Sequence, residues 1–346
     1  MRAEDSFDLD AVAGWLRSAR PDLPALSGTP ELRQFGGGAS NLTYLLGYPG
    51  AAFVLRRPPA GTKAKSAHDM RREYLIQSRL RPRFPYVPTM VALCEDESVI
   101  GSEFYVMEHL EGTILRRDLP PELGLTPSAT TALCRAAVDL LVELHRVDVE
   151  AVGLGGLSRG TGYVARQVAG WSGRYRAART PDVASFEEVM GWLHENQPSD
   201  IRTCLIHNDF RFDNLILAPG EPTRVIGILD WEMATVGDPL MDLGGALAYW
   251  AQAGDDPAFL ALRRQPTHAP GMLTRAEVLE HYLDRAGLRL TPEGWTFYEV
   301  FGLFRLAVIA QQIYFRFFHG QTSNPAYGAF LPAVRYLDTR CTRLIG

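Results

Sequence analysis

The first part of the chain alternates between apolar and polar positions, which is typical of β-strands. Residues 30–57 contain three such runs, separated by a glycine turn and by a proline-glycine turn, and we expect an antiparallel meander. Residues 89–96 and 103–110 are two further strand candidates. Between these groups, residues 66–80 carry apolar side chains at helical spacing after Ser66, which predicts a helix of about four turns with a serine cap.

The rest of the chain follows a helical period for most of its length. Thr126, followed by a proline, begins a strong helix pattern, because threonine is a favoured cap and proline a favoured first residue. β-rich runs return only between Cys204 and Asp230. A sheet with one helix, followed by a mostly helical part, predicts an α+β protein with lobes at residues 1–107 and 113–346 and a hinge at residues 108–112.

The composition places limits on size, charge and compartment. The chain has 346 residues, of which 46% are hydrophobic, so it can bury a sizeable core. Its formal net charge of -5 is small for this length, and we expect neither a nucleic-acid nor a membrane partner. The N-terminal stretch is acidic and lacks the apolar core of a signal peptide, so we expect a cytoplasmic protein. The four cysteines are scattered without a CxxC pair, which indicates buried thiols rather than disulfides or a zinc site.

Polar residues flank a hairpin that we predict within the β-rich window. The run LIL-APGEPT-RVIGILD reads as two strands around a turn that contains prolines and a glycine. The first strand begins after Asn214 and the second ends at Asp230, so we expect both side chains, with Asp209 just upstream, at the same end of the hairpin. Two oxygen ligands suit Mg²⁺, and a third carboxylate could accept a proton from a hydroxyl nucleophile. These are the groups that phosphoryl transfer requires.

The same segment resembles a known family. HNDFRFDN matches the kinase catalytic-loop pattern H-x-D-x-x-x-x-N, and ILDWE follows where kinase-like folds place a metal-binding aspartate. The longer run IHNDFRFDNLIL…VIGILDWEMATVGDPLMDLG resembles the aminoglycoside phosphotransferase family, whose relatives include the choline and homoserine kinases. The resemblance extends over residues 30–330 and implies a protein-kinase-like two-lobe fold that uses ATP and Mg²⁺.

The resemblance also implies roles for individual residues. Asp209 would be the catalytic base, and Asn214 and Asp230 would hold Mg²⁺. His207 has two readings, because it could orient the loop through a backbone hydrogen bond, as the family pattern implies, or accept phosphate. We expect both aspartates of GDPLMDL to satisfy buried backbone amides rather than contact substrate.

A kinase needs a nucleotide site in the N-terminal lobe. The glycine-rich turn in FGGGASN would bring N–H groups close to phosphates, and its candidate residues are Gly36, Gly37, Gly38, Ser40 and Asn41. Arg56 departs from the family, since most kinases have lysine there, but an arginine paired with Glu73 could still bridge phosphate oxygens. In EFYVMEHLEG, we expect Met107 to pack on adenine and backbone groups from Glu108 to Leu110 to meet its edge.

The acceptor of the phosphoryl group is expected to be a small hydroxyl compound. Residues 153–180 contain five arginines and no acid, which disfavours a polycationic aminoglycoside and would suit a phosphate or carboxylate. YVARQVAGWSGRYRAAR and RLAVIAQQIYFRFFHG resemble the branch of the family that is associated with acyl-CoA dehydrogenases, which implies a hydroxyacyl-CoA or a related acidic metabolite as acceptor. An antibiotic kinase and a nucleotide-binding pseudokinase are the alternatives.

Overall fold

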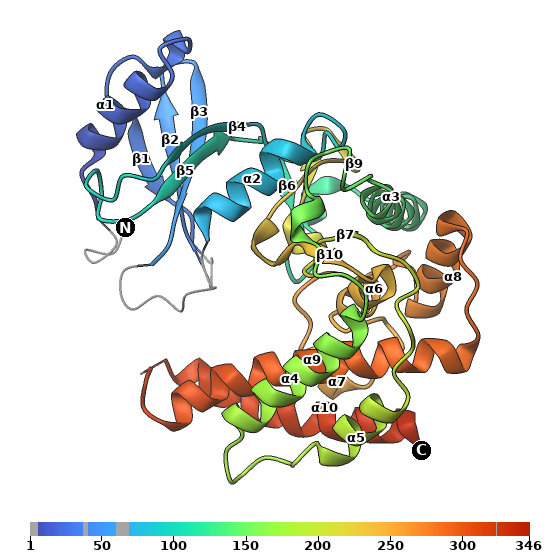
Figure 1. Cartoon of the computed structure of the whole chain (residues 1–346). Helices are drawn as coiled ribbons and strands as arrows, with labels where there is room; N and C mark the ends of the chain where they lie inside the picture. The colour runs from blue at the N-terminus through green and yellow to red at the C-terminus, as the bar shows by residue number, and fades with distance from the viewer. Residues whose placement is uncertain (1–5, 37–40, 60–68, 323) are drawn as a thin grey trace. The chain divides into compact units, whose positions relative to one another are not determined.

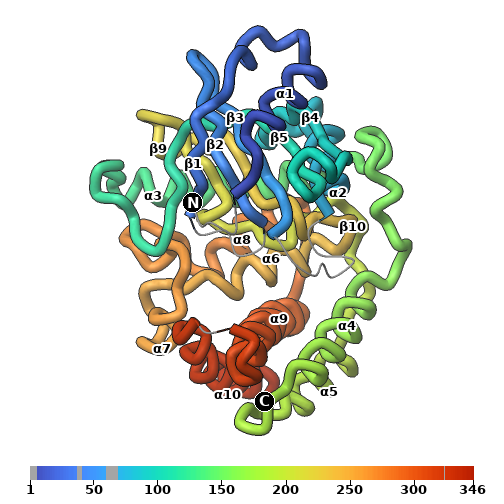
Figure 2. The backbone as a smooth tube through the Cα atoms, turned by 90° about the vertical axis from the view of Figure 1, so that its left-hand side faces the viewer, coloured from blue at the N-terminus to red at the C-terminus, as the bar shows by residue number. Residues whose placement is uncertain are grey.

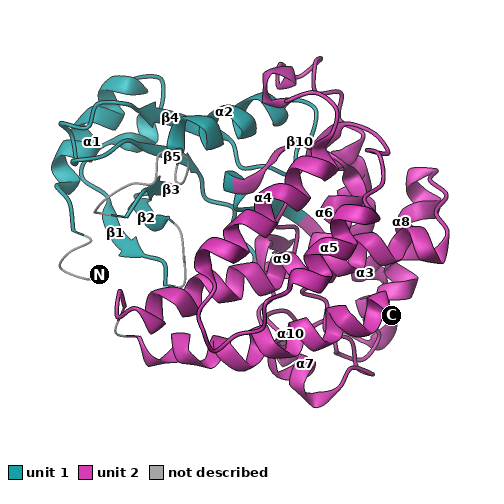
Figure 3. Ribbon diagram, turned by 60° about the horizontal axis from the view of Figure 1, so that its bottom comes forward, with its two compact units in different colours: residues 1–112, 226–232 teal, residues 113–225, 233–346 magenta. Residues whose placement is uncertain are grey.

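A computed structural model describes residues 6–36, 41–59, 69–322 and 324–346, and the chain divides into two compact units (Figure 3). Unit 1 comprises residues 1–112 and 226–232, and unit 2 comprises residues 113–225 and 233–346. Unit 1 therefore differs from the predicted N-terminal lobe, residues 1–107, in two segments: the predicted hinge at residues 108–112 and Ile226–Glu232. The second segment belongs to unit 1 because the Ile228 amide donates to the carbonyl of Tyr86 at 2.6 Å and other residues of the segment bind Arg56 and Arg72.

Unit 1 is built on the predicted antiparallel sheet (Figure 1). Its strands are β1 (Glu31–Gln34), β2 (Leu42–Tyr48), β3 (Ala51–Arg57), β4 (Met90–Cys94) and β5 (Phe104–Glu108). They lie in the order β1-β2-β3-β5-β4, so the meander and both later strands are confirmed. Along β3 and β5, successive side chains point to opposite faces, which creates two apolar surfaces.

A helix covers each face of this sheet. On one face, α2 (Met70–Leu80) buries Met70 against Val54 and Tyr105. The predicted serine cap is wrong, because the side chain of Asp69 accepts a hydrogen bond from the Arg72 amide and the helix begins at Met70. On the other face lies α1 (Leu9–Ala19), a helix that we did not predict, which packs its apolar side into the larger core cluster of unit 1.

Unit 2 contains two small sheets that carry the polar segment of the sequence. The three-stranded sheet consists of β6 (Thr113–Ile114), β8 (Leu215–Ala218) and β9 (Glu221–Ile228), and β9 continues into unit 1. The predicted hairpin is thus confirmed, with Gly220 at a φ of 73° in its turn, where only glycine is unstrained. A second sheet pairs β7 (Cys204–Ile206) with β10 (Thr235–Gly237).

Helices form the bulk of unit 2, and α9 packs against α4, α5, α6 and α10 (Figure 2). They are α3 (Pro127–His145), α4 (Tyr163–Ala178), α5 (Glu187–Glu195), α6 (Pro239–Leu247), α7 (Pro257–Ala261), α8 (Arg275–Ala286), α9 (Pro292–Phe318) and α10 (Phe330–Ile345). Thr126 caps α3, as predicted. By length and composition alone α9 could cross a membrane, but 61% of its apolar window is buried within the protein, as in a core helix.

The backbones of α6 and α9 touch where two glycines meet. A Cβ on Gly302 would lie 2.2 Å from the carbonyl oxygen of Gly244, and a Cβ on Gly244 would lie 2.5 Å from that of Tyr298. Neither distance is compatible with a real contact, so both positions require glycine for the helices to approach this closely.

We expect the same substitution to have opposite effects at two helical glycines. Gly302→Ala should destabilise the protein by about 1–3 kcal/mol, because its methyl group separates α6 from α9. Gly173→Ala, on the exposed side of α4 with no atom within 4 Å of the added carbon, should stabilise it by up to about 1 kcal/mol through helix propensity. Thermal melting of both variants checks this, and a stabilising Gly302→Ala would contradict the packing argument.

Candidate active site

The loop between β7 and β8 brings together two of the predicted site residues in unit 2. The side-chain amide of Asn214 donates to the backbone oxygen of Asp209 at 2.8 Å and to its Oδ2 at 3.0 Å. A single turn of 3-10 helix, Phe212–Asn214, folds the chain back so that these residues, five apart, can meet. The local conformation therefore holds the Asp209 carboxylate against Asn214.

Arg211 fixes the same carboxylate from another side. Its Nη2 lies 3.1 Å from Oδ2 of Asp209, and its guanidinium stacks 4.5 Å from the ring centre of Tyr249. Arg211 also lies 3.3 Å from Asp213, whose pKa is raised by burial. Both side-chain contacts of Asp209 use Oδ2, so Oδ1 accepts no hydrogen bond from the described part of the chain, and the carboxylate is 21% exposed.

His207 is buried and supports the backbone of the loop. Its Nδ1 accepts a hydrogen bond from the backbone amide of Asp209 at 3.2 Å, and its side chain is fully enclosed. A histidine without exposed surface is poorly placed to accept phosphate from a substrate, so these contacts favour the orienting role.

The two aspartates of GDPLMDL bind backbone amides, which confirms the expectation for them. Asp242 accepts the amides of His207 and Asn208, both at 2.7 Å. Asp238 caps α6 through Leu240 and also accepts the amide of Ile201 at 2.6 Å. Since a carboxylate that accepts several amides is held rigidly, Asp242 fixes the residues that precede Asp209.

Two residues that support Asp242 were not predicted: His145, which contacts it directly, and Tyr282, which contacts His145. His145 on α3 places its Nε2 3.1 Å from Oδ2 of Asp242 and its Nδ1 2.6 Å from the hydroxyl of Tyr282 on α8. Burial works to raise the pKa of Asp242, but the hydrogen bond and charge of His145 and those of His207 lower it below its ordinary value. Because these residues come from four distant segments, no local pattern in the sequence identifies them.

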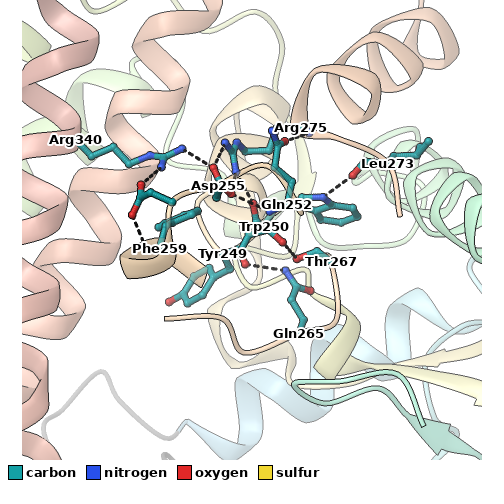
Figure 4. A network of polar contacts seen from close by, with 12 residues as sticks. Tyr249, Trp250, Gln252, Asp255, Phe259, Gln265, Thr267, Leu273, Arg275 and Arg340 are labelled. Carbon is teal, nitrogen blue, oxygen red and sulfur yellow. Dashed lines mark hydrogen bonds and ion pairs between the residues drawn. The ribbon is translucent and has the colours of Figure 1, made fainter. Parts of the chain in front are cut away.

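A further polar network, drawn in Figure 4, is linked to the 3-10 turn through Gln265. Gln265 accepts the amide of Phe212 at 2.9 Å and donates to the carbonyl of Tyr249 at 3.3 Å. The neighbouring carbonyl of Trp250 accepts a hydrogen bond from Arg275 at 2.8 Å, and Arg275 in turn pairs with Asp255. Figure 4 shows that these side chains converge on the segment from Tyr249 to Asp255, so this segment buttresses the loop.

Unit 1 holds a separate cluster of charges around Arg56. Its Nη1 lies 2.5 Å from Glu73 and its Nη2 lies 3.1 Å from Asp230, whose backbone has a φ of 65°. Arg56 is 8% exposed and Glu73 is 1% exposed. Burial opposes the charge of Arg56, yet Tyr105, Glu73 and Asp230 hold its pKa well above the ordinary value, whereas burial raises the pKa of Glu73. The predicted partners Arg56 and Glu73 are thus brought together, with Asp230 as an unpredicted third member.

The glycine-rich turn is described only in part. Gly37, Gly38 and Ser40 lie outside the described residues, and at Gly36 the structure leaves open space around an added Cβ. The side-chain amide of Asn41 donates to Oε2 of Glu232 at 3.1 Å, which engages a donor that we predicted for phosphate.

The end of β5 and the connection after it contain the residues that we predicted to meet adenine. Met107 lies opposite Val54 in the sheet and is nearly buried beside α2. The backbone amide of Glu108 donates to the carbonyl of Thr89 at 2.8 Å, and the contact of backbone groups from Glu108 to Leu110 with an adenine edge stays a prediction. Leu110 follows the end of the strand, where the ladder no longer uses its backbone groups.

The two predicted metal ligands belong to different units, Asn214 to unit 2 and Asp230 to unit 1. Their convergence on one ion therefore stays a prediction. Both side chains are suited to bind an ion. Asn214 donates from its amide nitrogen to Asp209, and Asp230 accepts from Arg56 through Oδ1 alone. An oxygen of each side chain is left for a hard cation.

Comparison with known proteins places this geometry in a family context. The model of the phosphotransferase enzyme family (APH) matches residues 31–279. A crystal structure from Ralstonia eutropha JMP134, provisionally named an aminoglycoside phosphotransferase, is 31% identical with a TM-score of 0.82 and covers 98% of both chains.

Two curated relatives are much longer proteins. Acyl-CoA dehydrogenase family member 10 of Mus musculus is 38% identical over 299 residues, which are 86% of this chain and 28% of that protein. Acyl-CoA dehydrogenase family member 11 of Homo sapiens is 35% identical over 328 residues, which are 93% of this chain and 41% of that protein. The chain thus spans less than half the length of either relative.

Proposed function

Because the chain belongs to the phosphotransferase enzyme family, we propose that it transfers the γ-phosphoryl group of ATP to a hydroxyl of a small molecule, with Mg²⁺ as cofactor. The resemblance and the protein-kinase-like α+β fold predicted from the sequence are both confirmed. Kinases of this family use ATP with a divalent metal ion. The observation that carries the proposal is the carboxylate of Asp209, which is fixed through one oxygen and open at the other.

In this proposal Asp209 orients and deprotonates the acceptor hydroxyl. Arg211 and Asn214 bind Oδ2 and prevent rotation of the carboxylate, so Oδ1 keeps a constant position for the incoming O–H group. Arg211 and Asn214 also draw negative charge toward Oδ2, so Oδ1 is the oxygen of the Asp209 carboxylate that accepts the proton. His207 and Asp242 contribute by fixing the backbone on which Asp209 stands.

The donor groups of Asn214 and Asp230 fit a magnesium ion. An amide oxygen and a carboxylate oxygen are hard donors, and Mg²⁺ commonly takes few protein ligands and completes its shell with water and phosphates. When bound, the ion would neutralise charge on the transferring phosphoryl group. Arg56, held by Glu73, would pair with nucleotide phosphates, and its buried Nε has no hydrogen-bond partner among the described residues.

For the acceptor we propose a hydroxyacyl group carried on coenzyme A, or a related acidic metabolite. The relatives named acyl-CoA dehydrogenase family members 10 and 11 support a link to acyl-CoA, and the excess of arginine in residues 153–180 supports an anionic compound. A cytoplasmic location is part of the same proposal, since acyl-CoA compounds and ATP are both available there.

A metabolite screen scored by ADP release tests the function. We expect turnover of hydroxyacyl-CoAs and little turnover of aminoglycosides, with an Asp209→Asn enzyme as the blank. Strong turnover of the antibiotics would contradict the charge argument. Binding of ATP without ADP release from any acceptor would instead favour a pseudokinase, for which Arg56 in place of lysine is the specific observation.

A further inference from the structure

Arg305, in the middle of α9, is a buried cation without a carboxylate partner. Its side chain is 7% exposed, and it forms no ion pair with the described residues. Its one hydrogen bond to a residue that the structure describes runs from Nη2 to the carbonyl of Asn208 at 2.7 Å. A guanidinium does not lose its proton in a protein, and buried charges are normally paired, so this one lacks the counter-charge that its position demands.

A second arginine meets Arg305 on the same indole ring. The Cζ atom of Arg305 lies 5.3 Å from the ring of Trp171 on α4, and that of Arg174 lies 4.6 Å from it. Arg174 is exposed and also has no ion pair among the described residues. Arg176, two positions further on, pairs with Glu187 at 2.6 Å. Among the described residues Arg166, on the same helix, has no ion pair either, so what distinguishes Arg305 and Arg174 is that both guanidiniums lie over one indole ring.

Arg305 contacts the loop of unit 2 that carries Asp209. Asn208, whose carbonyl binds Arg305, immediately precedes Asp209 and has a left-handed backbone with a φ of 65°. Tyr163, at the start of α4, donates its hydroxyl to Oδ1 of Asn208 at 3.4 Å. A Cβ on Gly245 would lie 2.8 Å from Nη1 of Arg305, so the glycine makes room for the guanidinium.

We propose that Arg305 and Arg174 bind an anionic group of the phosphoryl acceptor and so determine which acceptors Asp209 can use. The inference rests on the proposed function and adds the residues that select the substrate. Among the described residues Nη1 and Nε of Arg305 form no hydrogen bond, so both can donate to a phosphate or carboxylate oxygen. Trp171 holds both guanidiniums through its ring face without neutralising them.

The same negative group could come from two sources, the phosphates of coenzyme A or the carboxylate of a free hydroxy acid. We therefore compare one short hydroxyacyl group in three forms: as the coenzyme A thioester, as the uncharged N-acetylcysteamine thioester, and as the free acid. We expect the wild-type enzyme to have a lower KM for one of the charged forms than for the uncharged thioester. Which charged form has the lower KM identifies the source.

Substitution of the arginines should remove this preference. For the preferred charged acceptor, Arg174→Met is expected to raise KM about threefold to tenfold, and Arg305→Lys about tenfold to a hundredfold. The KM for the uncharged thioester should change little. The KM for the charged acceptor should depend more strongly on salt in the wild type than in the variants. Because Arg174 is exposed, its variant keeps the test valid even if changes at Arg305 impair folding.

Two controls separate this role from a purely structural one. Arg176→Met removes an arginine that is already paired, on the same helix, and should leave the preference unchanged. If Arg305 only braces Asn208, Arg305→Lys will lower kcat equally for all three acceptors and for ATP hydrolysis without acceptor, while Arg174→Met will have no effect. That result overturns the proposal.

Calorimetry measures binding at the proposed anion site in the absence of turnover. Coenzyme A and the free hydroxy acid are titrated into the wild-type protein and into Arg174→Met, and we expect the variant to bind one of them more weakly. Equal affinities for both probes would overturn the inference. Absence of ADP release from every acceptor, together with weaker anion binding by the variant, would instead refute the proposed function and leave the anion site standing.

Discussion

Asp209→Asn is expected to lower kcat by about 10²–10⁴-fold while the affinity for ATP stays unchanged. The amide keeps an oxygen for Arg211 and Asn214, so the contacts at Oδ2 survive in the variant. The oxygen that is free of hydrogen bonds becomes an NH₂ group, which cannot accept a proton from the acceptor hydroxyl. ADP release and calorimetry with an ATP analogue measure the two quantities separately.

The matched control is Glu221→Gln on the hairpin. This carboxylate is exposed and pairs with Arg224, so its conversion to an amide should leave kcat unchanged. An equal loss of turnover and of nucleotide binding in a folded Asp209→Asn protein would remove Asp209 from the role of base. It would indicate instead that the loop is needed for the nucleotide.

Arg56→Met is expected to destabilise the protein by about 3–5 kcal/mol and to abolish ATP binding. The substitution leaves Glu73 buried and ionisable without a partner, and Asp230 loses its ion pair as well. Urea unfolding followed by circular dichroism measures the loss of stability, and calorimetry measures nucleotide affinity.

A double variant separates the structural and functional parts of this effect. Arg56→Met with Glu73→Leu replaces the buried pair by apolar groups of similar size, which is often neutral for stability. We expect most of the lost stability to return, whereas ATP binding should stay absent. If the double variant bound ATP and turned over substrate, Arg56 would be a structural residue and the phosphate role would be refuted. Arg56→Lys, which keeps the charge but not the two-pronged geometry, should fall between the single variant and the wild type.

The sheet of unit 1 and the hairpin of unit 2 could be predicted because their signals are local. Alternation and turn residues specify β1 to β3 within residues 30–57, and Pro and Gly mark the turn before β9. The start of α2 was placed too early because Ser66 and Asp69 are both acceptable caps, and tertiary packing of Met70 decided between them.

The candidate site likewise has a local part, which could be predicted, and a part assembled from distant segments, which could not. The spacing of Asp209 and Asn214 indicated that they act together, because both lie in one short loop. The support from His145, Gln265 and Arg305 could not be predicted, since each reaches the loop from a helix or connection far along the chain. Arg305 did carry a weak signal, as a lone charge within the apolar run FGLFRLAVIA.

Unit 1 is assembled from two stretches that are separated by more than a hundred residues. During synthesis, residues 1–112 leave the ribosome before Ile226–Glu232 has been made, and at about 5–20 residues per second this interval lasts roughly 5–25 s. Through that time the nascent sheet carries Arg56 and Glu73 without Asp230. The contact between Arg56 and Asp230 is therefore made only after Asp230 has been translated, so a fragment that ends at Gly112 would never acquire it.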